Sequence, residues 1–434
     1  MNFCFKKFSK AIAALVIMLI AALATTAEAK EVTIGKLKYK VNTTDKIAKC
    51  TGLAEEATKN YNLTIPSTVT YEGVTLKVTT VEKEAFTGDN YLKKVTLSDN
   101  TETIGSYAFF GCDNISIVSL GKKLKIIGAY AFAHSGNSGT FTSITFPSTL
   151  EIIRDNTFMD CRYLETVVFG NKLQSIGECA FWHCDRLKTL LLPGSLQSIG
   201  ESAFAICDNL TEVTFQSGNG NCVIGEKCFD NLKSLTILNF QGPGVAEIGP
   251  SAFIGCRIQW LYLPSSVKKI GGGAFCGNDL TIIELSEGLE RIEELAFCDQ
   301  YSTGVKKIAI PSTVTYIGQK AFWNCGDPAD ISCAAVNPPV AGELVFDINV
   351  YDSVKLKVPQ ASVGKYRVAA LWKEFRYIND TDDNGVETVE MDADPQAGTE
   401  EWFNLQGNCV NPAVCPSGIY VVKTGGKIEK RVKQ

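Results

Sequence analysis

Few residues in this chain have the types and spacing that catalysis needs. Only two histidines, His134 and His183, are available as a general base for a serine or cysteine nucleophile, and each reads more simply as a loop or rim residue. The scattered aspartates and glutamates form no recognisable pair for glycan hydrolysis, and no glycine-rich phosphate loop follows a strand. The sequence therefore predicts that the protein is not an enzyme and holds no cofactor.

Cysteine is the other residue type that could react or bind a metal, and the chain has 16 of them. Several recur three residues after a repeated phenylalanine: Cys112, Cys161, Cys184, Cys207, Cys256 and Cys325. Such a column predicts buried, reduced thiols, although stacked repeats also bring some cysteines within bridging distance. Without a C-x-x-C pair, and with two histidines, no metal site is predicted. Cys409 and Cys415 bracket a short loop outside the repeats, where a disulfide and free thiols are equal alternatives.

The cysteine column belongs to a tandem repeat. The phrase Ile-Gly-x-x-Ala-Phe, or a near relative of it, recurs in steps of 22 to 26 residues and ends at Phe86, Phe109, Phe132, Phe158, Phe181, Phe204, Phe229, Phe253, Phe275, Phe297 and Phe322. A period of this length indicates one supersecondary unit per repeat, stacked into a solenoid with a continuous core. Function is then expected on a long surface.

Two apolar phrases alternate within each repeat. Leu-x-x-Val-x-Leu, as at Leu187–Leu192, has the period of a strand with one buried face, and a proline such as Pro193 often ends it. Leu-x-x-Ile-Gly, as at Leu196–Gly200, predicts a second short strand, whose glycine we expect to permit a turn with positive φ before Ala-Phe. The alanine should be small because neighbouring rungs stack at about 4.8 Å, and the phenylalanine should fill the core.

One stretch of the expected outer surface is apolar. The third and fifth residues of Leu-x-x-Val-x-Leu should point outward and are mostly polar. The exceptions are Ile237, Trp260, Tyr262 and Ile282, flanked by Asn239 and Glu284, with a smaller cluster at Val168 and Leu191. An apolar patch on a polar face predicts a partner-binding site. The alternatives are that a loop covers these residues or that the aromatics only shield the sheet.

The unit Leu-x-x-Val-x-Leu-Pro-x-x-Leu-x-x-Ile-Gly-x-x-Ala-Phe-x-x-Cys resembles the BspA-like leucine-rich repeats of bacterial surface proteins. The resemblance implies a β-rich leucine-rich-repeat solenoid of about eleven stacked repeats with short parallel strands, over residues 74–327. It also implies an N-terminal cap at residues 30–73 and a C-terminal cap at residues 328–379. Members of that family are associated with adhesion to host extracellular-matrix proteins and with aggregation between bacteria, so an adhesin-like role is implied.

Both ends of the chain predict export. Lys6, Lys7 and Lys10 precede an apolar run and the small residues Ala27 and Ala29, which is typical of a cleaved signal peptide at residues 1–29; an uncleaved anchor is the alternative. No later segment is expected to span a membrane. Residues 380–401 are acidic and polar, as in a linker. The tail, residues 402–434, resembles the C-terminal sorting domains of type IX secretion and implies a small β unit.

These features together predict a secreted or cell-surface protein that binds extracellular-matrix or cell-surface proteins. The net charge of −5 disfavours nucleic acid as a partner. A carbohydrate-binding surface protein for polysaccharide capture is the alternative, with Trp260 and Tyr262 stacking on sugar rings and Asn239 and Glu284 bonding hydroxyls. A structural spacer without a ligand is a third hypothesis.

Overall fold

The computed structural model describes residues 29–301 and 304–379, together with the backbone of four strands between residues 401 and 433. Two compact units divide the chain, Met1–Asp380 and Thr381–Gln434. Of the expected signal peptide, only Ala29 is among the described residues, and of the expected linker, residues 380–401, only Glu401 is.

Antiparallel strands begin the first unit. β1 (Lys30–Ile34), β2 (Leu37–Asn42) and β3 (Ile47–Leu53) pair in succession, and β5 (Thr68–Tyr71) pairs with β6 (Val74–Val81). The pairing of β3 with β6 is parallel, and it starts the ladder that the repeats continue. These strands cover the open end of the core, where Tyr39 is buried, and so protect an edge that would otherwise be free to pair with another chain.

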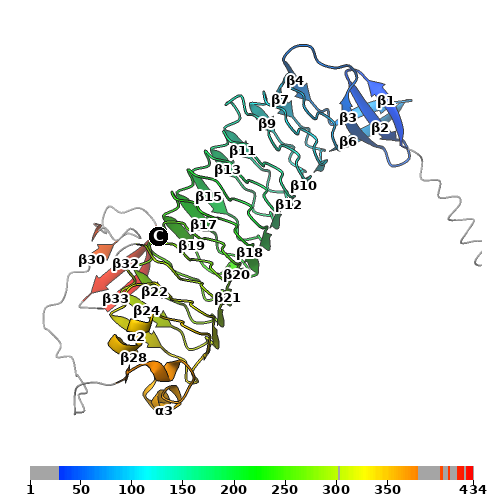
Figure 1. The fold of residues 1–434 in the computed structure, drawn as a ribbon. Coiled ribbons are helices and arrows are strands. Elements are labelled where there is room, and N and C mark those ends of the chain that lie inside the picture. The colour runs from blue at the N-terminus through cyan, green and yellow to red at the C-terminus, as the bar shows by residue number, and fades with distance from the viewer. Residues whose placement is uncertain are drawn as a thin grey trace, which may run out of the picture. The chain divides into compact units, whose positions relative to one another are not determined.

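The Leu-x-x-Ile-Gly phrases contribute one short strand each to a single parallel ladder (Figure 1). The inner isoleucine of each strand, such as Ile127 or Ile199, is buried, and its neighbour faces outward. After β6 the strands follow in the order β8 (Thr103–Ile104), β10 (Ile126–Ile127), β12 (Ile152–Ile153), β14 (Ser175–Ile176), β16 (Ser198–Ile199), β18 (Cys222–Ile224), β20 (Val245–Ile248), β21 (Lys269–Ile270), β23 (Arg291–Ile292), β25 (Tyr316–Ile317) and β27 (Val340–Ala341).

The Leu-x-x-Val-x-Leu phrases form a second series of parallel strands, whose outer surface we call the strand face. Its members are β4 (Tyr61–Thr64), β7 (Leu92–Thr96), β9 (Ile117–Ser119), β11 (Ser143–Thr145), β13 (Thr166–Val168), β15 (Thr189–Leu192), β17 (Glu212–Phe215), β19 (Ile237–Phe240), β22 (Ile282–Glu284), β24 (Lys307–Ile310), β26 (Asp330–Cys333), β28 (Lys355–Lys357) and β29 (Tyr377–Ile378). The predicted alternation is confirmed, as in β13, where Val167 is buried between exposed Thr166 and Val168. β15 ends before Pro193 as expected. The predicted leucine-rich-repeat solenoid is thus the fold.

The repeated phenylalanines form a continuous stack of rings along the core. Centroids of neighbouring rings lie 4.9–5.5 Å apart, with interplanar angles of at most 12°. The stack extends beyond Phe322 to Phe346, because β26 and β27 supply another rung within the segment expected as the C-terminal cap. The repeats therefore continue past residue 327.

The glycine of the Ile-Gly phrase serves a different purpose from the one expected. Positive φ falls two residues later, at Tyr107 (58°), Tyr130 (58°) or Ser202 (53°), and the glycine itself does not adopt it. At Gly200, a Cβ atom would lie 2.4 Å from the backbone nitrogen of Glu178 in the preceding rung. The expected turn with positive φ before Ala-Phe is present, but a residue other than the glycine supplies it, and close approach between rungs explains the glycine instead.

The cysteine column lies in the core, and its predicted burial is confirmed. Each thiol donates to the backbone carbonyl of the phenylalanine one repeat earlier, as Cys112 does to Phe86 (3.0 Å) and Cys207 does to Phe181 (3.3 Å). Where the column lacks cysteine, Ser135 bonds Phe109 (2.6 Å) and Asn278 bonds Phe253 (2.8 Å) in the same way. The column thus gives these buried carbonyls a hydrogen bond from the next repeat, in addition to the backbone N–H that several of them, such as Phe86 and Phe181, already accept within the turn.

Short helices close the far end of the first unit: α2 (Ile348–Ser353), η1 (Gln360–Ser362), α3 (Val363–Tyr366) and η2 (Trp372–Glu374). Trp372 and Tyr366 are buried, and their polar tips donate to the carbonyls of Pro339 and Ala335, both at 2.8 Å. Phe375 meets the last ring of the stack edge-on, with a centroid distance of 5.6 Å from Phe346. These bulky residues cap the core.

The second unit is a small antiparallel sheet in the order β31 (Cys409–Val410), β30 (Glu401–Phe403), β32 (Gly418–Thr424) and β33 (Lys427–Lys433). Cys409 is in β31, but Cys415 lies outside the described residues, so the expected alternatives for this pair stay open.

Candidate functional site

The strand face presents two outward columns in register. One column runs through Thr189, Glu212 and Ile237, and the other runs through Leu191, Thr214 and Asn239, because parallel pairing places equivalent residues side by side. The same register relates Ile282 to Lys307 and Glu284 to Ala309 farther along. Side chains from consecutive repeats therefore line up in surface rows, and neighbours within a row are about 4.8 Å apart.

The apolar cluster expected at Trp260 is found on this face. Trp260 is 38% and Tyr262 is 58% exposed, while Ile237 and Ile282 are half-buried at the same outward positions. Neighbouring residues of the phrase, Leu261 and Leu263, point inward and are buried. We call Ile237, Trp260, Tyr262 and Ile282 the aromatic patch.

The polar side chains beside the aromatic patch, Asn239 and Glu284, already have partners on neighbouring strands. Asn239 donates its amide to Glu212 (3.4 Å) and Thr214 (3.5 Å), and Glu284 forms an ion pair with Lys307 (3.2 Å). Partial burial and the charge of Glu284 raise the pKa of the Tyr262 hydroxyl, so this hydroxyl stays protonated and able to donate. The patch is therefore an apolar area whose polar groups are the Tyr262 hydroxyl and the Trp260 indole N–H, and its polar neighbours already have partners.

The repeat phrase predicts a strand at Trp260 and Tyr262, but the structure has none there. Residues 257–263 form no strand, although all are described, so the ladder of this face is interrupted between β19 and β22. The alternation of buried and exposed side chains survives the interruption.

The smaller cluster is also outward. Val168 is 49% and Leu191 is 51% exposed, on adjacent strands β13 and β15. Ile117, which is 50% exposed on β9, was missed, although it occupies the same third position and the same rule would have found it. Apolar side chains thus recur along the strand face on both sides of the polar Glu212, Thr214 and Asn239.

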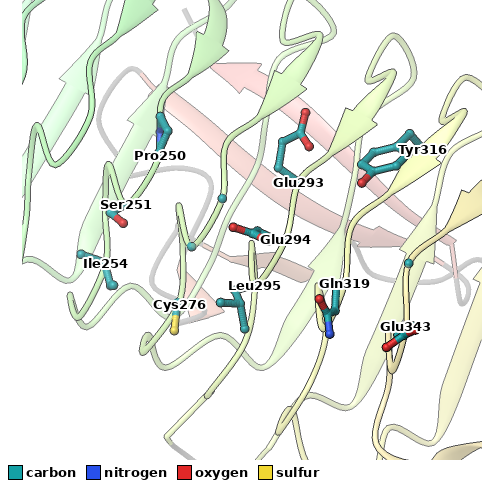
Figure 2. A pocket seen from close by; sticks show the side chains of 13 residues that line it. Pro250, Ser251, Ile254, Cys276, Glu293, Glu294, Leu295, Tyr316, Gln319 and Glu343 are labelled. Carbon is teal, nitrogen blue, oxygen red and sulfur yellow. The ribbon is translucent and has the colours of Figure 1, made fainter.

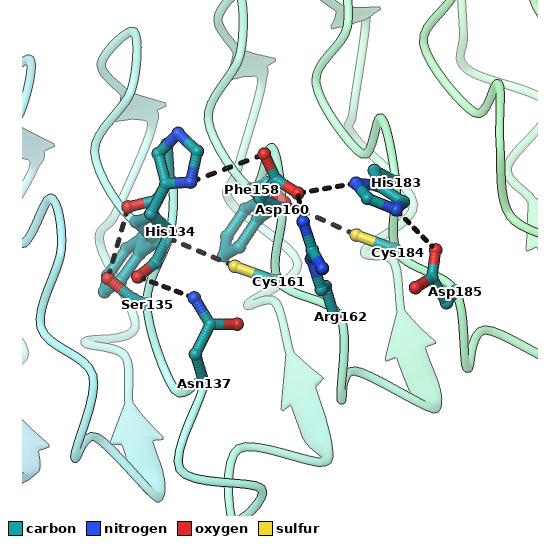
Figure 3. A network of polar contacts seen from close by, with 12 residues as sticks. His134, Ser135, Asn137, Phe158, Asp160, Cys161, Arg162, His183, Cys184 and Asp185 are labelled. Carbon is teal, nitrogen blue, oxygen red and sulfur yellow. Dashed lines mark hydrogen bonds and ion pairs between the residues drawn. The ribbon is translucent and has the colours of Figure 1, made fainter.

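A second concentration of polar groups lies at the turns that follow the phenylalanines (Figure 3). His183 Nδ1 lies 2.6 Å and His134 Nδ1 lies 3.4 Å from the carboxylate of buried Asp160, and Arg162 contacts that carboxylate at 3.1 Å. His183 Nε2 also lies 3.3 Å from Asp185. The sequence predicts each histidine as a loop or rim residue, but the stacking of the repeats places both of them next to the carboxylate of Asp160.

The nucleophilic groups near these histidines point elsewhere. Cys161 donates to the carbonyl of Phe132 (3.1 Å), Cys184 to that of Phe158 (3.3 Å), and Ser135 to that of Phe109 (2.6 Å). Figure 3 shows these bonds directed into the core. Since each hydroxyl or thiol is engaged there, the arrangement links three successive turns and does not align a nucleophile with a base.

A groove of about 660 Å³ lies along the same series of turns farther toward the C-terminus (Figure 2). Because Gly272 and Gly273 have no side chains, space remains between Ser251 and Ile254 on one side and Leu295 on the other. Glu294 and Glu343 make its lining acidic, and Cys276 also contributes to it.

Comparison with known proteins identifies the family. Residues 57–141, 136–241 and 219–329 match the BspA type leucine rich repeat region, in 6 copies. The chain belongs to the BspA-type leucine-rich repeat family.

Solved structures with similar folds are leucine-rich repeat and surface proteins. A leucine rich cell surface protein of Faecalibacterium prausnitzii is 23% identical, and the match covers 71% of this chain and 95% of that chain, with a TM-score of 0.37. A leucine-rich repeat protein of Bacteroides ovatus is 21% identical over 77% of this chain and 96% of that one (TM-score 0.31). The pneumococcal vaccine antigen PcpA is 18% identical over 83% of this chain and 100% of that one (TM-score 0.43). No curated protein matches the chain significantly.

Within the described part of the chain, none of the helices has the length and apolar character required to cross a bilayer.

Proposed function

We propose that this protein is a secreted or cell-surface, adhesin-like binding protein that engages proteins of a host matrix or a neighbouring cell through its strand face. The observation that carries the proposal is the aromatic patch, where Trp260 and Tyr262 stand outward on a face whose other rows are mainly polar. Tryptophan and tyrosine are enriched among the residues that dominate binding energy at protein interfaces. Membership of the BspA-type repeat family supports a protein-binding role and an extracellular or cell-surface location.

The mechanism is the burial of a small apolar patch on a rigid support. Trp260 and Tyr262 lie where the strand ladder is interrupted, but the buried side chains of Leu261 and Leu263 and the ring stack beneath them anchor this segment before a partner arrives. Little conformational entropy is therefore lost when the patch is covered. Leu191 lies three rungs and Val168 four rungs from Tyr262, or roughly 14 Å and 19 Å at the usual strand spacing, and they would provide a second contact for a partner that spans this distance. Many copies on one cell would multiply a weak individual affinity.

Carbohydrate capture is the second candidate, because Trp260 and Tyr262 offer rings for sugar stacking. That hypothesis also requires Asn239 and Glu284 to bond sugar hydroxyls, but these groups are already engaged with Glu212 and Lys307. Their engagement favours a protein surface over a glycan.

The test is binding of the purified chain to parallel arrays of matrix proteins and glycans, together with the variant Trp260→Ala/Tyr262→Ala. Loss of two central contacts should weaken saturable protein binding by at least about tenfold, or roughly 1.4 kcal/mol. The matched control is Tyr301→Ala/Trp323→Ala, which removes the same residue types from exposed positions outside the strand face. Equal weakening by both variants, or saturable binding to glycans alone, would contradict the proposal.

A further inference from the structure

Two cysteines and an aspartate converge where the rungs of Phe275 and Phe297 stack. Cys276 and Cys298 directly follow these phenylalanines, and Gly277 donates its backbone N–H to the carbonyl of Cys298 at 2.9 Å, which holds the two turns side by side. One ligand atom each from Cys276, Cys298 and Asp299 lies within 4.8 Å of both others. Among the described residues, this is the one group of three such side chains close enough to share a metal ion.

We propose that Cys276, Cys298 and Asp299 form a binding site for a thiophilic divalent cation of the zinc type. The ion would be held by two thiolates and one carboxylate, and the three ligands would leave one position of a tetrahedral ion for water. Binding converts two thiols to thiolates and releases their two protons, so no oxidant or reductant takes part. The site is separate from the strand face and does not depend on the proposed function.

The distances fit such an ion. Cys276 Sγ and Asp299 Oδ2 are 3.6 Å apart. Metal–sulfur bonds of about 2.3 Å and metal–oxygen bonds of about 2.1 Å at a tetrahedral angle require an S···O separation of about 3.6 Å. Cys276 and Asp299 are therefore at the separation that the ion requires, and the Cys298 ligand atom lies within 4.8 Å of both.

The carboxylate is oriented by a neighbouring rung. Asn324 Nδ2 donates to Asp299 Oδ1 at 2.7 Å, which leaves Oδ2 directed toward Cys276. Outer hydrogen bonds of this kind commonly fix the carboxylates and histidines that bind metals.

The thiols also differ from those of the core column. The column thiols are buried, and each donates to a backbone carbonyl of the core, as Cys161 does to that of Phe132. Cys276 is partly exposed and lines the groove of Figure 2, so solutes reach it from that side. This access distinguishes Cys276 from the buried thiols of the column, which an ion could reach only if the core opened.

The experiment is a titration of the full chain with Cd²⁺ alone, after reduction with a phosphine and removal of metal, followed through the ultraviolet charge-transfer absorption of cadmium thiolates. We expect one Cd²⁺ per chain, release of two protons and displacement by Zn²⁺. Cys276→Ser and Cys298→Ser should abolish the absorption, and Asp299→Asn, which keeps both thiols, should weaken binding at least tenfold. Circular dichroism verifies that each variant is folded.

The matched control is Cys179→Ser, which removes another partly exposed thiol that belongs to no such group, and it should bind Cd²⁺ like the unaltered chain. The proposal is overturned if absorption does not saturate at one ion or persists in both Cys276→Ser and Cys298→Ser. It is also overturned if peptide mapping of the untreated protein finds Cys276 and Cys298 joined by a disulfide.

Discussion

Removal of one ring from the middle of the phenylalanine stack should destabilise the solenoid strongly and locally. Phe204 is fully buried, and its ring lies 5.2 Å from that of Phe181 and 5.3 Å from that of Phe229, nearly parallel to both. The substitution Phe204→Ala leaves a cavity that costs about 3–5 kcal/mol. We expect the upper part of this range, because two stacked contacts are lost and each contributes about 0.5–1.5 kcal/mol beyond burial.

The backbone prevents the gap from closing. Phe204 donates its N–H to the carbonyl of Cys228 (2.9 Å), and Phe181 donates to that of Ala203 (2.8 Å), so the turns on both sides are held at their spacing. A cavity whose walls cannot collapse keeps nearly its full cost.

Hydrogen exchange followed by mass spectrometry is the appropriate assay, because a repeat array can open locally without unfolding as a whole. A loss of 3 kcal/mol should accelerate exchange in the rungs of Phe181, Phe204 and Phe229 by roughly a hundredfold or more. Leu191→Ala, which alters a half-exposed residue of the strand face, should change stability by no more than about 0.5 kcal/mol. A loss below about 1.5 kcal/mol in Phe204→Ala, or equal effects in the two variants, would refute the account of the core.

Three further predictions follow from the cysteine column and the turn network. Burial raises the pKa of Cys112, Cys161 and Cys256 to about 12, so the folded chain keeps these protons while the unfolded chain loses them above about pH 8.5. The free energy of unfolding should therefore be at its full value below about pH 8.5. Above that pH it should fall by about 1.4 kcal/mol per pH unit for each thiol, up to about pH 12. A urea midpoint that does not change between pH 8 and pH 10 would contradict the burial of these thiols. In native protein at pH 8, iodoacetamide should modify the partly exposed Cys179 before Cys161, and the reverse order in a peptide map would contradict the burial described here. The substitution Asp160→Asn keeps the side-chain shape and suits the left-handed backbone, but it removes the charge that faces His183 and Arg162. Because these partners are partly exposed, we expect the free energy of unfolding to fall by about 1–2 kcal/mol. An unchanged midpoint of thermal unfolding would show that the network adds no stability.

Clusters that join different repeats were missed, because their members are far apart in the chain. His134, Asp160 and His183 each lie two residues after a repeated phenylalanine, so an alignment on that phenylalanine would have placed them in one column, as it did for the cysteines. Cys276 and Cys298 share another column, one residue after the phenylalanine, and no local motif marks a site whose ligands are a whole repeat apart. The rung of Phe346 was missed because its phrase lacks two of the usual residues: Ala341 replaces the isoleucine before Gly342, and Val345 replaces the alanine.

The period of the chain determined most of this protein by itself: the parallel strands, the ring stack, the buried cysteine column and the outward aromatic patch all follow from which residue types recur at one repeat position. The tertiary structure alone decided which turn residue takes positive φ, that glycine is required where neighbouring rungs approach closely, and how side chains of different repeats meet at Asp160 and Cys276. The physical reason is that a repeat phrase specifies one rung and its buried face, whereas contacts between rungs depend on the stacking distance and on the direction of each side chain from its own turn.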